Sequence, residues 1–296
     1  MTAVMKPGWS KPSTLLFASE IPANQKAFAF ALAQAKELGA NLILFHAYDT
    51  LVVAASETSG IRYYDYAAAA RAEKDQLEPM AQQVRKEGVQ CEVVVRPGLA
   101  ADQILAFVRE REVDRIVMGT HSPGPIGKML VGSVAEAVLR TAKVPVFIVG
   151  PGVVDGAYRN FATRTILCAV SLRETSCLVV KFAAELAAQH NARLILQHVI
   201  RHQKRAEILT NRSIDQIESD LASMVPAEIR GKIAVQAIAV KGDPTEDLLY
   251  QSRTQQADLI VMGAQSASAL AAITRQGVVY KVLAGSHCPV ITLCLN

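Results

Sequence analysis

The residues best placed to do chemistry are the glycines of a loop between positions 119 and 132. An apolar run ends at the first of them, and Ser133 opens a helical pattern directly after the last. Glycines let a backbone approach an anion closely, and the free N–H groups at a helix N-terminus favour negative charge. The pattern predicts a turn that binds phosphate or another anion. In the alternative interpretation, the glycines only shape the turn.

The elements that must position this loop follow from alternating apolar runs and helical patterns. We expect strands at 14–19, 42–47, 92–95, 115–118 and 144–149, and helices at 25–38, 67–87, 101–110 and 133–141. The order then repeats, with strands at 165–170, 193–199, 233–240, 259–262 and 290–293 and a charged helix at 201–221. Apolar strands separated by helices favour a parallel, doubly wound sheet. Ligands of such sheets bind beyond the carboxyl ends of the strands, where this loop would lie.

The chain also contains an internal duplication. Residues 38–46 are similar to 190–198, 114–119 to 258–263, and 144–149 to 288–293. A length of 296 residues suits two domains of about 150 residues each. We therefore expect two tandem α/β domains, at 1–150 and 151–296, each a doubly wound, five-stranded parallel sheet.

Composition argues against several classes of protein. Apolar residues make up 51% and charged residues 20% of the chain, and the net charge of +4 gives no case for nucleic acid or a membrane surface. The N-terminal residues lack the apolar stretch of a signal peptide, and no apolar run approaches the ~18 residues of a membrane helix. The five cysteines form no CxxC pair, so we expect free thiols in a reducing cytoplasm.

The order and spacing of these residues resemble those of the universal stress proteins. Nucleotide-binding members of that family carry Gly, two residues, Gly, nine residues, then Gly-Ser or Gly-Thr. Here Gly119, Ser122 and Gly132-Ser133 fit that spacing, with serine at the second glycine. Further matches are Phe45-His46, Gly98, Gly242 to Glu246, and the Val-Pro-Val and Cys-Pro-Val strands. The resemblance implies a Rossmann-like, adenine nucleotide α-hydrolase-like fold in both domains.

The resemblance further implies an adenine-nucleotide site in the first domain, holding ATP with or without Mg²⁺. The residues that carry over to this site are Ser19, Glu20, Ala47, Met118, Gly119, His121, Ser122, Gly124, Gly127, Gly132, Ser133 and Val134. Ser19 stands where the family has an acidic residue, and Glu20 is the adjacent substitute. The second domain has Ser171 at the acidic position and Gln276-Gly277 at the Gly-Ser pair. We expect that loop to be a degenerate copy.

No residues can be nominated for catalysis or for binding a metal. Gly127-Lys128 fails as a Walker A fragment, because Met129 stands where that motif has serine or threonine. His198 and His202 have a helical metal-ligand spacing but lie at the end of a strand, where that spacing does not align their side chains. We therefore expect a regulatory binding protein of the stress response, with at most weak ATP hydrolysis. The alternative function is a nucleotide-free scaffold with both sites degenerate.

The resemblance also implies association through the last strand of each domain. Residues 144–149 and 290–293 would pair within one chain as a pseudo-dimer, or between chains in a homodimer. A protein partner is expected as well, but nothing in the sequence identifies it.

Overall fold

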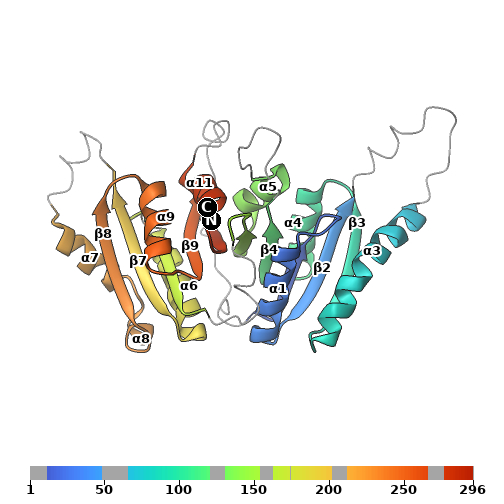
Figure 1. Cartoon of the computed structure of the whole chain (residues 1–296), viewed down its shortest axis with the longest axis horizontal. Helices are drawn as coiled ribbons and strands as arrows, with labels where there is room; N and C mark the ends of the chain where they lie inside the picture. The colour runs from blue at the N-terminus through green and yellow to red at the C-terminus, as the bar shows by residue number, and fades with distance from the viewer. Residues whose placement is uncertain are drawn as a thin grey trace.

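The computed structural model describes residues 12–48, 66–120, 131–153, 163–173, 175–201, 212–265 and 277–295. These residues form one ten-stranded sheet in the order β3-β2-β1-β4-β5-β10-β9-β6-β7-β8 (Figure 1). Neighbouring strands run parallel throughout each half, and only β5 and β10 pair antiparallel. We refer below to the first half, which contains β1 to β5, and the second half, which contains β6 to β10.

The order of elements agrees with the sequence-based expectation, and most bounds move by only one or two residues. The first half consists of β1 (Thr14–Ala18), α1 (Gln25–Leu38), β2 (Asn41–Tyr48), α3 (Tyr66–Lys86), β3 (Cys91–Pro97), α4 (Ala100–Glu110), β4 (Arg115–Gly119), α5 (Ser133–Thr141) and β5 (Val146–Val149). The second half consists of β6 (Thr165–Ala169), α6 (Ser176–His190), β7 (Arg193–Ile200), α7 (Ile214–Ser223), α8 (Ala227–Arg230), β8 (Val235–Lys241), α9 (Pro244–Thr254), β9 (Leu259–Gln265), α11 (Val278–Gly285) and β10 (Val290–Leu295).

One expected helix was wrong at its N-terminal end. The charge pattern predicted a helix over 201–221, but Arg201 is not helical and α7 begins at Ile214. Ser213 sets this boundary with a capping box, because its hydroxyl accepts from the N–H of Gln216 and the Gln216 side chain accepts from the N–H of Ser213. Residues 202–211 lie outside the described part of the chain.

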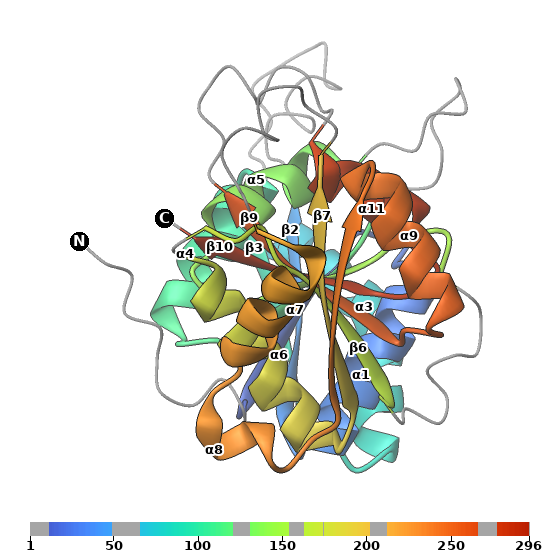
Figure 2. The ribbon, with the colours of Figure 1, turned by 90° about the vertical axis from the view of Figure 1, so that its left-hand side faces the viewer.

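The sheet is buried on both faces, which explains its nearly continuous apolar strands. In β2, Leu42 and Leu44 pack in one core layer with residues of α1 and α3, while Ile43 and Phe45 pack in the opposite layer with residues of α4 and α5. Alternate side chains of a strand point to opposite faces, so each strand supplies both layers. In the view of Figure 2 the strands fan out, because the twist accumulates across the sheet.

The two halves join through the antiparallel pair β5 and β10. Val290 is opposite Ile148 and Thr292 is opposite Val146, which confirms the expected pairing of the last strands within one chain. A second contact joins the ends of α1 and α6, where His190 Nδ1 lies 2.7 Å from a Glu37 carboxylate oxygen. The chain is thus a covalently linked pair of similar units that share one sheet.

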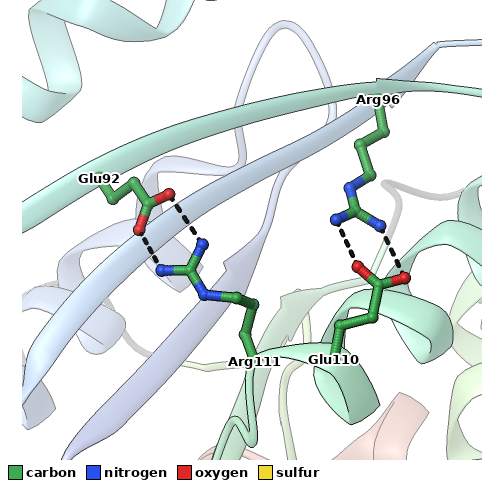
Figure 3. Close-up of polar contacts among 4 residues, drawn as sticks. All are labelled: Glu92, Arg96, Glu110 and Arg111. Carbon is green, nitrogen blue, oxygen red and sulfur yellow. Dashed lines mark hydrogen bonds and ion pairs between the residues drawn. The ribbon is translucent and has the colours of Figure 1, made fainter.

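Two bidentate ion pairs fasten the outermost strand of the first half to α4. Arg96 of β3 binds Glu110, with N–O distances of 3.2 and 2.6 Å, and Arg111 binds Glu92 of β3 at 3.2 and 2.9 Å (Figure 3). Both guanidinium groups also lie over the ring of Phe107, at 4.7 and 5.5 Å from its centroid. These charges stabilise an edge strand and discourage its pairing with another chain.

Two further features bear on the class of protein. All five cysteines are free, as the sequence predicted. None of the described helices combines the length and the apolar composition that crossing a membrane requires.

Candidate functional site

The candidate site lies where the strand order reverses. From β1 the chain proceeds outward through β2 and β3 on one side, and it then returns to add β4 and β5 on the other side. Ala18 at the end of β1 is opposite Met118 near the end of β4. Crevices at such switch points bind ligands in open parallel sheets. The fold therefore brings Ser19 and Glu20 close to the start of the glycine loop.

Ser19 and Glu20 differ in how much they can offer a ligand. Ser19 is 8% exposed, and its hydroxyl donates to the carbonyl of Glu20 at 2.7 Å. Its backbone is held by the Phe45 carbonyl and by His46, whose Nδ1 lies 2.9 Å from the Ser19 carbonyl. Glu20 is exposed. Of the two side chains, the carboxylate of Glu20 is therefore the better placed to contact a bound molecule.

The second-half counterpart of Ser19 is Val170 and not Ser171. His198 Nδ1 lies 2.8 Å from the Val170 carbonyl, and the Val170 N–H donates to Gln197, which repeats the contacts of Ser19 with His46 and Phe45. Counting back from the end of the helix misplaced this position, because α6 has 15 residues and α1 has 14. Ser171 instead forms a hydroxyl contact with Ser176. An aliphatic side chain thus replaces the polar group.

The end of β4 is packed against the N-terminus of α1. Met118 is 4% exposed and belongs to the core beneath the site. A Cβ atom at Gly119 would lie 2.6 to 2.7 Å from three side-chain atoms of Asn24, so only glycine fits there. Asn24 also donates to the Thr120 carbonyl at 3.3 Å. Sequence reasoning missed Asn24, although an asparagine just before a helical pattern is a recognisable N-cap.

Thr120 is the last described residue before the loop. Its N–H donates to the Val149 carbonyl of β5 at 3.1 Å. Its side chain is 6% exposed, and the hydroxyl oxygen has no hydrogen-bond partner within the described part of the chain. A buried hydroxyl without a partner is costly. This group is therefore available to a ligand that reaches it.

The loop ends at the N-terminus of α5. Gly132 is the N-cap residue, with φ −59° and ψ 153°, and no side chain caps the helix. The N–H groups of the first helical turn have no partner within their own helix. Ser133 is exposed and Val134 is half-buried. Three peptide N–H groups here form the positive end of the helix dipole, which suits a phosphate.

The remaining predicted residues are placed as follows. Ala47 is half-buried near the carboxyl end of β2, which neighbours β1. His121, Ser122, Gly124 and Gly127 lie outside the described residues. His46 Nε2 lies 3.9 Å from a carboxylate oxygen of Glu73. In the described ranges, no group of three or more His, Cys, Asp or Glu side chains could hold a metal ion.

At the carboxyl ends of its strands, the second half has one helix with a charged cap and one without a capping side chain. Asp243 caps α9 at the carboxyl end of β8, and its carboxylate accepts from the N–H groups of Thr245 and Glu246 at 2.8 and 3.0 Å. These hydrogen bonds, that of Glu246 foremost, lower the pKa of Asp243. Gly277 is the N-cap residue of α11, again without a capping side chain.

Comparison with known proteins identifies the family. A sequence profile described as the universal stress protein family matches residues 14–150 and 162–293. The chain belongs to the universal stress protein family. Both halves carry the family's domain, in tandem, and the resemblance noted from the sequence is confirmed.

Individual universal stress proteins are similar over parts of the chain. Universal stress protein YxiE of Bacillus subtilis is 31% identical over 131 residues, which are 42% of this chain and 88% of that protein. Universal stress protein MJ0531 of Methanocaldococcus jannaschii is 32% identical over 76 residues, which are 26% of this chain but only 45% of that protein. A universal stress protein structure from Archaeoglobus fulgidus covers 98% of this chain and 99% of its own, with a TM-score of 0.75 and 19% identity. That structure has the same fold over nearly the whole length.

Proposed function

We propose that the first half of this universal stress protein binds an adenine nucleotide, ATP, and that binding regulates the protein's interactions during stress. The observation that carries the proposal is the pairing of β1 with β4 at the switch point. There the exposed Glu20 follows the end of β1, the glycine-only position Gly119 ends the neighbouring strand β4, and the loop after β4 leads to the uncapped N-terminus of α5. A carboxylate, a close backbone approach and free N–H groups match a ribose, a base and a phosphate chain.

Each group has a role in this proposal. Glu20 replaces the usual acid and accepts from a ribose hydroxyl, because the Ser19 hydroxyl is already engaged with its neighbour's carbonyl. Ala47 and Met118 border the base, and Gly119 lets the backbone approach. The N–H groups of Ser133 and Val134 receive the phosphates, with Gly132 leaving room for them. His121, Ser122, Gly124 and Gly127 complete the loop.

A magnesium ion would come with the nucleotide. Mg²⁺ in nucleotide sites commonly takes phosphate oxygens, waters and one or two carboxylates as ligands. The described residues contain no cluster of three His, Cys, Asp or Glu side chains that could form a metal cage. Glu20 is the exposed carboxylate of the site and the group that could bind a water of the hydrated ion.

The second half, in this proposal, carries no nucleotide. Val170 stands where the first half has Ser19, and Ser171 is engaged with Ser176. Gln276 stands where the motif has glycine. We accordingly propose functional units at 1–150 and 151–296, with a binding site in the first unit only.

The proposed mechanism is a shift of conformational population without turnover. A ligand that binds one arrangement of the loop more tightly increases the population of that arrangement, and with it the surface offered to a partner. Hydrolysis would need a base aimed at a water, and none is evident among the described residues of the site. We propose a cytoplasmic binding protein whose partner is another protein or a second copy of the chain.

Calorimetric titration with ATP tests this proposal directly. Gly132→Val should abolish binding, because the side chain occupies the space of a phosphate, and the variant should fold, because the φ of Gly132 suits any residue. Gly277→Val is the matched control at the N-cap of α11, where the nearest atoms to a new Cβ are 3.6 Å away. Binding that survives Gly132→Val unchanged would contradict the proposed site.

The competing function is a scaffold without nucleotide. The departures from the family's binding pattern that motivate it are Ser19 and Ser122 in the first half and, in the second half, Gln276 and the position that the sequence assigned to Ser171 and the structure to Val170. In that case neither the wild type nor Gly277→Val would take up ATP in the titration.

A further inference from the structure

Asn24 connects two elements of the candidate site through one side-chain amide. Its Oδ1 accepts from the N–H of Ala27 at 3.0 Å and so caps α1. Its Nδ2 donates to the Thr120 carbonyl at 3.3 Å. The same side chain therefore satisfies a helix N-terminus and holds the first residue after β4.

The packing around this amide is tight. Any Cβ at Gly119 would overlap the Asn24 side chain, so the two residues are in direct contact. On its other side, Thr120 is held by the hydrogen bond from its N–H to Val149 of β5. The backbone at the entrance to residues 121–132 is thus fixed from two directions, by a neighbouring strand and by Asn24.

The second half lacks this connection. Thr175 is the counterpart of Asn24, because each is the N-cap residue of its helix and each is the sixth residue after its strand. The Thr175 side chain makes no capping hydrogen bond, and the hydroxyl of the next residue, Ser176, contacts Ser171 and accepts from the N–H of Arg173. Among the described residues of that half, neither Thr175 nor Ser176 makes a hydrogen bond to the end of β9. The hydrogen bond from the helix N-cap to the residue after the strand is therefore found in the first half, where we propose the nucleotide site.

We propose that Asn24 is a positioning residue of the first-half nucleotide site. By anchoring the backbone at Gly119 and Thr120 to α1, it fixes the point from which the loop leads to α5, and it does so without touching the nucleotide itself. The inference rests on the proposed function. Beyond that function, we infer that ligand affinity depends on the side-chain amide of Asn24, which also caps α1.

Asn24→Ser separates the two roles of the side chain. Serine is as good an N-cap as asparagine, so α1 keeps its cap, but its hydroxyl is too short to reach the Thr120 carbonyl. Ser213→Ala is the matched control, because it removes the N-cap of α7 in the other half of the molecule. Thermal unfolding of both variants reports the structural effect of each substitution.

Two measurements then decide the matter. In calorimetry with ATP, Asn24→Ser should bind about two- to tenfold more weakly than wild type, as expected for one lost neutral hydrogen bond, and the loss of that bond should also lower its thermal midpoint slightly. Ser213→Ala should lower the midpoint and leave the affinity unchanged. In hydrogen exchange of the ligand-free protein, the segment 115–120 should exchange faster in Asn24→Ser.

The failures of the two proposals are distinguishable. Wild-type affinity in Asn24→Ser, with unchanged exchange at 115–120, would overturn the positioning role while leaving nucleotide binding in place. If the wild type binds no ATP, the proposed function fails. The exchange result then still decides whether Asn24 anchors Thr120.

Discussion

At the scale of single residues, the site depends on side chains that shape the backbone more than on reactive groups. Gly119 has no space for a Cβ because Asn24 fills it, and the Ser19 hydroxyl is engaged with an adjacent carbonyl. At the end of β1, Ser19 is buried and the adjacent Glu20 is an exposed acid. A site of this kind is suited to holding a ligand by its backbone, which agrees with a binding role.

Gly119→Ala should destabilise the protein by about 1–3 kcal/mol, because the new methyl group overlaps Asn24. Asn24→Gly alone should cost a few tenths of a kcal/mol to about 1 kcal/mol, since glycine is tolerated at an N-cap but leaves the hydrogen bonds unmade. In the double variant the overlap disappears, so the two costs should not add. Urea unfolding of the four proteins measures this coupling. Strict additivity would contradict the close contact of Gly119 with the Asn24 side chain.

At the scale of elements, helix ends determine how accurately the sequence can be interpreted. Gly39, with φ 62°, ends α1 where the glycine predicted, and Asn191, with φ 50°, ends α6 at the matching place. In the second half, the side chains of Ser213 and Asp243 cap α7 and α9 and so set where these helices begin. The periodicity of side chains alone could not locate the start of α7.

Asp243→Ala should lower the free energy of unfolding by about 1 kcal/mol at neutral pH. Hydrogen bonds from Glu246 and Thr245 lower the pKa of Asp243 in the folded state. The stabilisation is therefore fully present above the unfolded pKa of about 3.9, and it is lost as the pH falls through the lower folded value. Ser213→Ala, which removes an uncharged cap, is the control. In chemical denaturation from neutral pH down to about pH 2, the free energy of unfolding of Asp243→Ala should approach that of wild type as the pH falls, and that of Ser213→Ala should not.

The fold could be predicted closely because apolar strands, glycine stops and an internal repeat all give the same order of elements. What the sequence could not give are relations between residues far apart in the chain. The contact of Asn24 with Gly119 spans 95 positions, and no local pattern encodes it. The extra residue within α6 shifted the expected counterpart of Ser19 from Val170 to Ser171, because spacing was counted back from the end of the helix only.

At the scale of the whole molecule, the two halves form a pseudo-dimer built into one chain. The antiparallel pair β5 and β10 continues the sheet across the junction. Directly after β5 the chain passes close to the C-terminal end of α11. A Cβ at Gly150 would lie 2.7 Å from the Leu283 carbonyl oxygen, and one at Gly152 would lie 2.7 Å from that of Ser286. Packing between the halves thus requires these glycines.

Gly150→Ala should cost about 1–3 kcal/mol, because its methyl group meets a backbone oxygen that cannot move aside without shifting α11. Gly231→Ala is the matched control, since nothing lies within 4 Å of a Cβ there. Its stability should stay level or rise by up to about 1 kcal/mol, through a less flexible unfolded chain. Calorimetric unfolding measures both. Equal effects of the two substitutions would argue against close packing at the junction.

The central claim is that one half of this universal stress protein holds an adenine nucleotide and the other does not. The most direct measurement purifies the protein without added nucleotide, precipitates it with acid, and identifies the released small molecules by chromatography and mass spectrometry. We expect about one adenine nucleotide per chain, and none from Gly132→Val. Two nucleotides per chain would contradict the assignment of the second half. None from the wild type, together with no uptake of added ATP, would contradict the nucleotide site itself.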